Sequence, residues 1–297
     1  MAYTTYQEPE VFFESSSDFL DYLENTPFAP NWAKHEGEGA RAPCSQTWGN
    51  KPSDSWDDNC GYEQAIEFAK NGWPKGTKLL SEQLELERME GATPRRIHDV
   101  GGDFPDVGRY LAGLPDCMTR RIIRQGHRRP IITIEIGCTF SADVQSQNIM
   151  YLGAGVATLV DTLETMGFRV AVNVYWRTVT SGGTPCTTVQ VKKPDQALNM
   201  SDLIFFLAHP AALRRLAFHH WETTYGGDEW DGGYGKPRAK KYSKEQEEDH
   251  NFIYFDDLNS AVFTMRSTKQ AVEYVEKVVR EKSPELFSHH EKPPEAV

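Results

Sequence analysis

One histidine and two arginines lie close together in the sequence and are of types that take part in acid–base catalysis, metal ligation or anion binding. His209 precedes Pro210 between two predicted helices, where an imidazole is able to act as a general base or a metal ligand. Arg214 and Arg215 follow one turn or more further along the chain, where they are positioned to hold an anion. Because no acidic partner or nucleophile is evident for His209, the pattern favours a histidine that caps a helix junction over a catalytic one.

A second group of basic residues lies before the most regular part of the chain. It consists of Arg120, Arg121, Arg124, Arg128 and Arg129. Clustered arginines contact phosphate groups, so this group predicts nucleic-acid binding as one hypothesis. Acidic residues outnumber basic ones by 43 to 32, however, and the same arginines are able to neutralise the protein's own carboxylates. Neutralisation is the favoured interpretation.

The composition is that of an ordinary globular protein of the cytoplasm. The chain has 297 residues, 39% of them hydrophobic and 25% charged, which allows one large or two modest domains. A formal net charge of −11 argues against general nucleic-acid binding. We expect no membrane partner, because no apolar run reaches membrane-spanning length and the first residues do not resemble a signal peptide. The cysteines are odd in number and lack CxxC spacing, which predicts reduced thiols: Cys44, Cys60, Cys117, Cys138 and Cys186.

The elements that position these side chains are clearest between residues 130 and 176. Residues 131–136 form an apolar run of strand length, and a second strand is predicted at residues 169–176. Between them, apolar residues recur at three- and four-residue steps, as on one face of a helix. This order predicts a βαβ unit, whose first loop lies at the carboxyl end of the first strand.

The rest of the chain divides into parts of different regularity. Residues 1–128 are predicted to form a helical and loop-rich N-terminal extension, and residues 129–282 an α/β domain. The Gly-rich and mixed-charge segment 225–250 is predicted to be a mobile insert in that domain, and residues 283–297 a flexible tail. A turn signal at residues 181–183 predicts an antiparallel strand beside the second strand of the βαβ unit.

The succession of elements from residue 131 to residue 282 resembles a von Willebrand factor A-type Rossmann-like domain. The resemblance implies a mostly parallel central sheet with helices on both faces. In that family the first strand ends in an Asp-x-Ser-x-Ser metal site, whose aligned positions here are Gly137, Thr139 and Ser141. Since the leading aspartate is absent, a solvated loop is the favoured interpretation. The weak candidates to hold a divalent cation are Thr139, Ser141, Asp143, Asp256 and Asp257.

Three segments resemble an uncharacterised protein family encoded mainly by tailed bacteriophages. Residues 65–76 read Ala-Ile-Glu-Phe-Ala-Lys-Asn-Gly-Trp-Pro-Lys-Gly, and residues 99–118 contain Asp-Val-Gly-Gly, Leu-Ala-Gly and Cys-Met. Residues 206–215 read Phe-Leu-Ala-His-Pro-Ala-Ala-Leu-Arg-Arg. This resemblance, which covers about residues 55–280, implies a phage-encoded protein in the host cytoplasm.

These observations lead to three functional hypotheses. The first is a non-enzymatic adaptor that binds a phage or host protein, with an AAA-type ATPase as one candidate partner. The second is nucleic-acid binding in phage replication or transcription through the arginines of residues 120–129. The third is a metal-dependent hydrolase that uses Asp143, Asp256, Asp257 or His209. We expect no cofactor, apart from the divalent cation of the third hypothesis.

Overall fold

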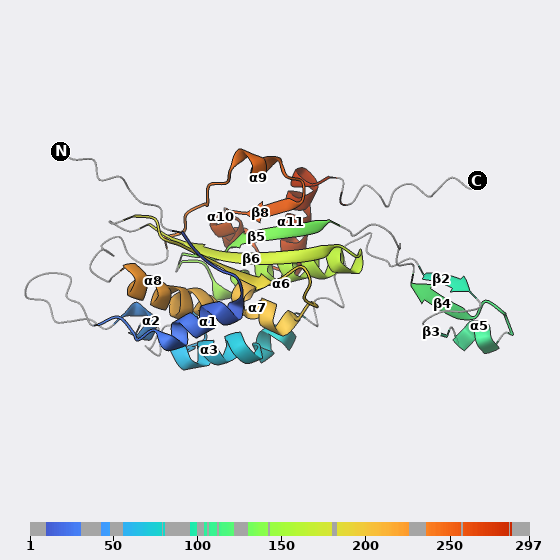
Figure 1. Cartoon of the computed structure of the whole chain (residues 1–297), viewed down its shortest axis with the longest axis horizontal. Coiled ribbons are helices and arrows are strands. Elements are labelled where there is room, and N and C mark those ends of the chain that lie inside the picture. Colours follow the sequence, from blue (N-terminus) through green and yellow to red (C-terminus); the bar gives the residue numbers. More distant parts are fainter. Residues whose placement is uncertain are drawn as a thin grey trace, which may run out of the picture.

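The computed structural model shows a mixed α/β protein with two separate sheets (Figure 1). The described residues are 10–30, 43–47, 56–78, 80, 96–99, 104–105, 107–111, 113–121, 130–141, 143–179, 183–225, 236–256, 258–284 and 286. The predicted α/β class and the mostly parallel central sheet are confirmed.

The central sheet has the strand order β1-β7-β6-β5-β8. Its strands are β1 (Glu10–Phe13), β5 (Ile131–Gly137), β6 (Arg169–Arg177), β7 (Cys186–Lys192) and β8 (Phe252–Phe255). Strand β5 pairs in parallel with both β6 and β8, whereas β7 runs antiparallel to β6, as the turn signal predicts. Strand β1 pairs in parallel with β7, so residues of the predicted N-terminal extension form one edge of this sheet.

The helices connect these strands and cover the core. They are α1 (Ser16–Asn25), α2 (Cys44–Thr47), α3 (Tyr62–Asn71), α5 (Val107–Leu111), α6 (Ser146–Thr165), α7 (Met200–Ala208), the π-helix η1 (Ala212–Ala217), α8 (Phe218–Tyr225), α9 (Lys244–Glu248), α10 (Leu258–Thr264) and α11 (Thr268–Lys282). Helix α6 links β5 to β6, which completes the predicted βαβ unit. A Cβ atom on Gly153 of α6 would lie 2.5 Å from the Cβ atom of Ala208, so this glycine permits close packing of α6 and α7.

One face of the sheet is apolar and packs against the helices. Trp176 of β6 is fully buried on this face, where Phe19 of α1 stacks on it at 5.8 Å between ring centroids. Phe206 of α7 contacts the same ring, and Trp221 of α8 donates a hydrogen bond to Thr187 of β7. Helices from both halves of the chain therefore share one core on this face.

Helices are expected on both faces of the sheet, but among the described residues the opposite face carries the extended segment before α9 rather than a layer of helices. This face presents polar groups, because Glu135 and Tyr175 alternate along β5 and β6 with the apolar residues of the core. Lys240 and Tyr242, from an extended segment that precedes the short helix α9, lie against this face. This segment belongs to the predicted insert at residues 225–250, whose residues 226–235 lie outside the described part.

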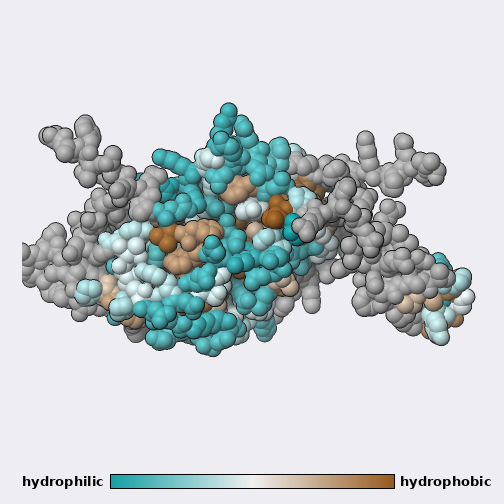
Figure 2. All heavy atoms as spheres, in the orientation of Figure 1, coloured by the Kyte–Doolittle hydropathy of each residue, from teal (hydrophilic) through white to brown (hydrophobic). Residues whose placement is uncertain are grey.

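The second sheet is small and lies at one end of the molecule, apart from the central sheet (Figure 1). It consists of β2 (Arg96–Asp99), β3 (Phe104–Pro105) and β4 (Met118–Arg121), in the antiparallel order β2-β4-β3. Helix α5 and the turn after it expose Tyr110, Leu111 and Leu114 to solvent. Figure 2 shows apolar residues on the surface of this part of the molecule.

Candidate binding site at the carboxyl edge of the central sheet

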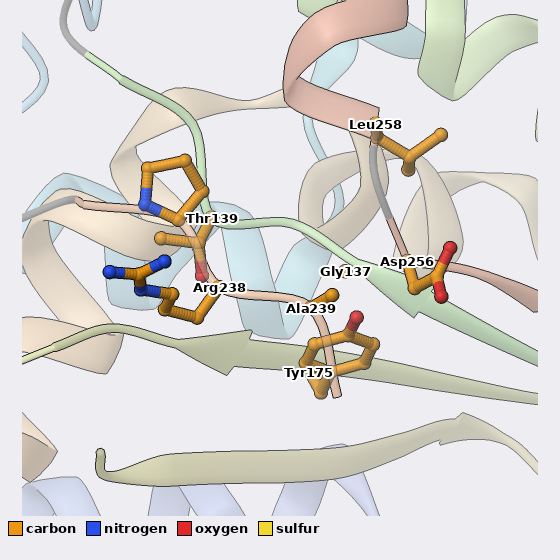
Figure 3. Close-up of a pocket in the computed structure, with 8 residues that line it drawn as sticks. Gly137, Thr139, Tyr175, Arg238, Ala239, Asp256 and Leu258 are labelled. Atoms are coloured by element: carbon orange, nitrogen blue, oxygen red, sulfur yellow. The ribbon is translucent and has the colours of Figure 1, made fainter. Parts of the chain in front are cut away.

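A cavity of about 170 Å³ opens where the parallel strands of the central sheet end (Figure 3). Strand β5 has β6 on one side and β8 on the other, and open α/β sheets bind ligands where neighbouring connections diverge in this way. Most parts of the cavity wall come from strand ends and from the extended segment before α9. The lining residues are Gly137, Thr139, Tyr175, Pro237, Arg238, Ala239, Asp256 and Leu258.

The end of β5 is a glycine because the phenol of Tyr175 occupies the space beside it. Gly137 and Tyr175 are paired across β5 and β6. A Cβ atom at position 137 would lie 2.7 Å from the hydroxyl oxygen of Tyr175, which is closer than such atoms pack. The position that the sequence resemblance aligns with a metal-binding aspartate therefore accommodates a tyrosine side chain from the neighbouring strand.

Tyr175 is the buried hydrogen-bonding group of the cavity. Its side chain is 1% exposed, and its hydroxyl makes no hydrogen bond of ordinary geometry with the described residues. In Figure 3 this hydroxyl points toward the space between Gly137 and Asp256. Burial raises the pKa of Tyr175, and the negative charge of Asp256 contributes in the same direction. The phenol therefore stays protonated at neutral pH and acts as a hydrogen-bonding group rather than as a base or nucleophile.

An ion-pair network behind Tyr175, buried at Glu135 and exposed at Glu10, holds the extended segment on the sheet. The Lys240 ammonium lies 3.1 Å from a carboxylate oxygen of Glu135 and also pairs with Glu10 of β1. Burial acts to lower the pKa of Lys240, but the charge of Glu135 and the hydrogen bond to Glu10 outweigh it, so the pKa is raised. The same ammonium lies 5.7 Å from the centroid of the Tyr175 ring. These contacts fix both the tyrosine and the segment that carries Arg238.

The structure brings together only some of the residues predicted to hold a cation. Thr139 and Asp256 line the cavity, but the Thr139 hydroxyl accepts a hydrogen bond from the Arg177 backbone N–H at 2.8 Å. Ser141 donates to Asp143 at 3.3 Å in a solvent-exposed contact, and neither residue lines the cavity. Asp257 lies outside the described residues.

The donor set of the cavity does not fit a magnesium site. Within the described part of the chain, no three His, Cys, Asp or Glu side chains are grouped closely enough to hold a metal ion. Among the described residues, the cavity is lined by one carboxylate, Asp256, together with a protonated phenol. Mg²⁺ requires near-octahedral oxygen ligation, usually with carboxylates, and the described lining supplies one carboxylate, a threonine hydroxyl that already accepts a hydrogen bond, and a phenol.

His209 lies elsewhere, at the junction of α7 and η1. Its Nδ1 atom accepts a hydrogen bond from the Ala211 backbone N–H at 3.0 Å, which places the proton of the neutral ring on Nε2. The side chain is 4% exposed and lies against Trp73 and Phe205. Burial lowers the pKa of His209 to about 4, so the ring is neutral at pH 7. This geometry is that of a buried residue that caps a helix junction.

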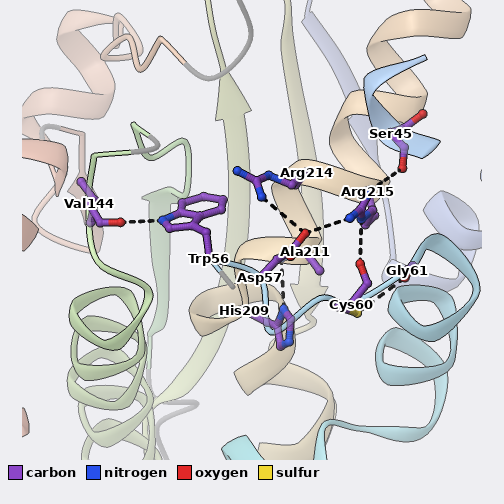
Figure 4. A network of polar contacts seen from close by, with 10 residues as sticks. All are labelled: Ser45, Trp56, Asp57, Cys60, Gly61, Val144, His209, Ala211, Arg214 and Arg215. Atoms are coloured by element: carbon purple, nitrogen blue, oxygen red, sulfur yellow. Dashed lines mark hydrogen bonds and ion pairs between the residues drawn. The ribbon is translucent and has the colours of Figure 1, made fainter. Parts of the chain in front are cut away.

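The Arg215 guanidinium forms its hydrogen bonds and ion pair with other groups of the protein (Figure 4). Its guanidinium lies 3.1 Å from the carboxylate of Asp57, and both side chains are fully buried. It also donates to the backbone carbonyls of Cys60 at 2.7 Å and Ser45 at 3.1 Å. The anion that the two arginines hold is therefore Asp57, which approaches Arg214 to within 3.7 Å.

This network connects the N-terminal extension to the rest of the molecule. Trp56, next to Asp57, lies under the Arg214 guanidinium at 4.5 Å and donates a hydrogen bond to the Val144 carbonyl at 2.5 Å. Val144 belongs to the loop after β5, and η1 is a π-helical turn, a feature that often occurs at functional sites. Residues 43–47 and 56–60 thereby link the π-helix to the carboxyl edge of the central sheet. The sequence predicts that Trp56 packs against the protein, but Asp57 and the partners of both residues were missed, because nothing near them in the chain indicates those partners.

The predicted arginine cluster is only partly described. Arg120 and Arg121 belong to β4, whereas Arg124, Arg128 and Arg129 lie outside the described residues. The strand register places Arg121 opposite Arg96 of β2. Two basic residues that are distant in the sequence are therefore neighbours in the small sheet.

The fold is that of a mixed α/β protein with a cavity at the carboxyl edge of its main sheet. The profile of a family described as a domain of unknown function (DUF7192) matches residues 4–281, and the chain belongs to that family. Neither the comparison with curated proteins nor the comparison with solved structures found a match. No helix in the described residues has the length and apolar character needed to cross a membrane.

Proposed function

We propose that this protein is a non-enzymatic adaptor that binds another protein. Its α/β domain is proposed to be von Willebrand A-like, and the antiparallel position of β7 beside β6, with β8 on the far side of β5, supports that resemblance. The polar groups of the cavity support recognition rather than catalysis, since the Tyr175 phenol stays protonated. His209 and Arg215 are engaged in contacts within the fold.

The observation that supports the adaptor function most strongly is an exposed apolar surface on the small sheet. Tyr110 is 67% exposed, Leu111 79% and Leu114 41%; we call these residues the α5 surface. Aromatic and aliphatic side chains form the cores of protein interfaces, where burying each one contributes about 1.5–3 kcal/mol. The small sheet stands apart from the main sheet, so a partner is able to reach this surface (Figure 1).

The resemblance to a bacteriophage family indicates the setting of this function. We propose that the protein is phage-encoded and acts in the cytoplasm of the infected cell. Its partner is proposed to be a phage or host protein, with an AAA-type ATPase as the first candidate to examine. An ATPase encoded beside this protein in the genome would support that choice of partner.

Substitutions in the α5 surface test the adaptor function. A tagged full-length chain is expected to recover one stoichiometric partner from infected cells, and Tyr110→Ala with Leu111→Lys is expected to reduce that recovery at least tenfold. Phe263→Ala is the matched control, because Phe263 is 40% exposed on α10 of the main domain and its loss is expected to leave recovery unchanged. Recovery of no partner by the wild-type chain, or equal recovery by both variants, would contradict the proposal.

The strand register supports nucleic-acid binding as a second candidate function. Strand pairing places Arg121 opposite Arg96, so basic residues from two separate parts of the sequence come together in the small sheet. Arg120→Glu with Arg121→Glu is expected to abolish retention on DNA-cellulose at low salt and to flatten the salt dependence of binding. Lys277→Glu with Arg280→Glu replaces two exposed basic residues of α11 and serves as the control, because it makes the same change in net charge. This candidate is excluded if the wild-type protein is not retained at low salt.

A further inference from the structure

We infer that the cavity at the carboxyl edge of the central sheet binds a primary ammonium or guanidinium group, the end of a lysine or arginine side chain of a protein partner. This inference rests on the proposed adaptor function, and it assigns to that function a second contact, distant from the α5 surface. It is argued from the charges and hydrogen-bonding groups that line the cavity.

An unpaired carboxylate defines the charge preference of the cavity. Asp256 is partly buried at the end of β8 and forms no hydrogen bond or ion pair with the described residues. It faces Tyr175 across the cavity (Figure 3), and its negative charge contributes to the raised pKa of that tyrosine. A carboxylate that is partly removed from water gains from pairing with a cation, because both solvent screening and hydration are reduced there.

Tyr175 complements Asp256 as a hydrogen-bonding partner for such a cation. Its hydroxyl lines the cavity and is buried without a hydrogen bond of ordinary geometry to the described residues. Burial raises the pKa of this hydroxyl and outweighs the Lys240 backbone N–H and the Tyr242 hydroxyl, which lie near enough to lower it. A protonated phenol has oxygen lone pairs that accept from an N–H donor, and ammonium and guanidinium groups have three and five such donors. A bound cation would therefore satisfy the buried hydroxyl and the unpaired carboxylate together.

The other charged groups around the cavity do not favour an anion in its interior. Lys240 is held by Glu135 and Glu10, and the Arg177 guanidinium donates to the backbone carbonyl of Ala239. Arg238 is exposed at the rim, where water screens its charge. An anion inside the cavity would be repelled by Asp256. A cation would be attracted by Asp256, and the Lys240 and Arg177 side chains nearby are already paired within the protein.

The size of the cavity indicates that the cation belongs to a larger molecule. A volume of about 170 Å³ suits a group of roughly the size of benzene, such as the end of a lysine or arginine side chain, and the binding free energy available from so few atoms is small. A free amine would accordingly bind weakly, whereas the same group on a protein gains from the rest of the interface. The net charge of −11 also favours association with a basic partner.

The ammonium chemistry is testable by NMR on the full chain labelled with ¹³C-tyrosine, using butylammonium chloride as the probe. We expect a saturable shift of the Tyr175 signal, which the Tyr175→Phe variant identifies by its disappearance. Asp256→Asn is expected to weaken butylammonium binding at least tenfold. Asp143→Asn removes an exposed carboxylate outside the cavity and is expected to leave binding unchanged. Thermal unfolding of each variant checks that the fold is retained.

Several outcomes of this titration would overturn the inference. They are the absence of a saturable shift, an equal affinity in Asp256→Asn, and a shift of the same signal by sodium butyrate or magnesium chloride in place of butylammonium.

Capture of the partner separates this inference from the adaptor function. If Asp256→Asn recovers the partner as well as wild type does, the cavity contact is wrong and the adaptor function stands. If butylammonium binds and no partner is recovered, the adaptor function is wrong. The proposal that a partner's side chain supplies the cation is then wrong as well.

Discussion

Replacing Arg215 by alanine is expected to lower the free energy of unfolding by about 3–5 kcal/mol, the usual cost of removing one member of a buried ion pair. The Arg215 and Asp57 side chains are both fully buried, so water cannot replace the missing guanidinium. The carbonyls of Ser45 and Cys60 would lose their donors at the same time. Arg214 would remain as a cationic neighbour of Asp57, at the longer distance of 3.7 Å.

Urea unfolding monitored by tryptophan fluorescence measures this loss directly. Lys70→Ala is the matched control, because Lys70 pairs with Glu24 at 2.6 Å but both side chains are 41% exposed. An exposed pair of this kind contributes about 0–1 kcal/mol, so the control is expected to unfold almost as the wild-type chain does. A change of less than 1 kcal/mol in Arg215→Ala would show that the network does not anchor the N-terminal extension.

Acidification from pH 6.5 to pH 4.5 is expected to destabilise the fold steeply. His209, His219 and His220 are buried, and burial lowers the pKa of each from 6.5 to about 4. Between these two pKa values the unfolded chain binds protons that the folded chain does not. The free energy of unfolding therefore rises with pH across this range and falls on acidification. Each proton contributes about 1.4 kcal/mol per pH unit, so the three histidines together give a slope of about 4 kcal/mol per pH unit.

The slope is measurable by urea unfolding at closely spaced pH values between 7 and 4.5. The variant His209→Asn keeps an oxygen that is able to accept from the Ala211 backbone N–H and removes one titrating group. This variant is expected to reduce the slope of the free energy of unfolding against pH by about one third, because the three histidines contribute equally. Equal stability of the wild-type chain at pH 6.5 and pH 4.5 would contradict the assignment of three neutral buried histidines.

The parts of the fold that could be predicted are those with a local pattern. The apolar run of β5, the spacing of apolar residues in α6 and the turn before β7 all depend on residues close in the sequence. Strand β1 was not predicted, since four residues with the burial pattern of an edge strand give little periodicity. The pairing of β2 with β4 was also missed, because neither strand is long enough to indicate its partner.

The candidate site was predicted only in part, for a similar reason. The carboxyl edge of β5 was identified as the place for a site, and Thr139 and Asp256 do line the cavity there. Tyr175 was missed because β6 is an apolar run that is buried almost throughout. The available signal was that Asn173 and Tyr175 are polar at alternate positions of β6, on the face that Glu135 of β5 shares. Arg215 was interpreted as a residue that binds an anion, but its actual partner, Asp57, was not identified because it lies 158 residues away in the sequence.

The adaptor function is tested most directly by photocrosslinking from the α5 surface in infected cells. Benzoylphenylalanine would replace Tyr110, which is 67% exposed, and in a second chain it would replace Phe263, which is 40% exposed on the main domain. The account predicts one predominant covalent adduct with the partner from position 110 and none from position 263. It would be contradicted by a partner that copurifies with the protein yet forms no adduct from position 110, or forms one from position 263 instead.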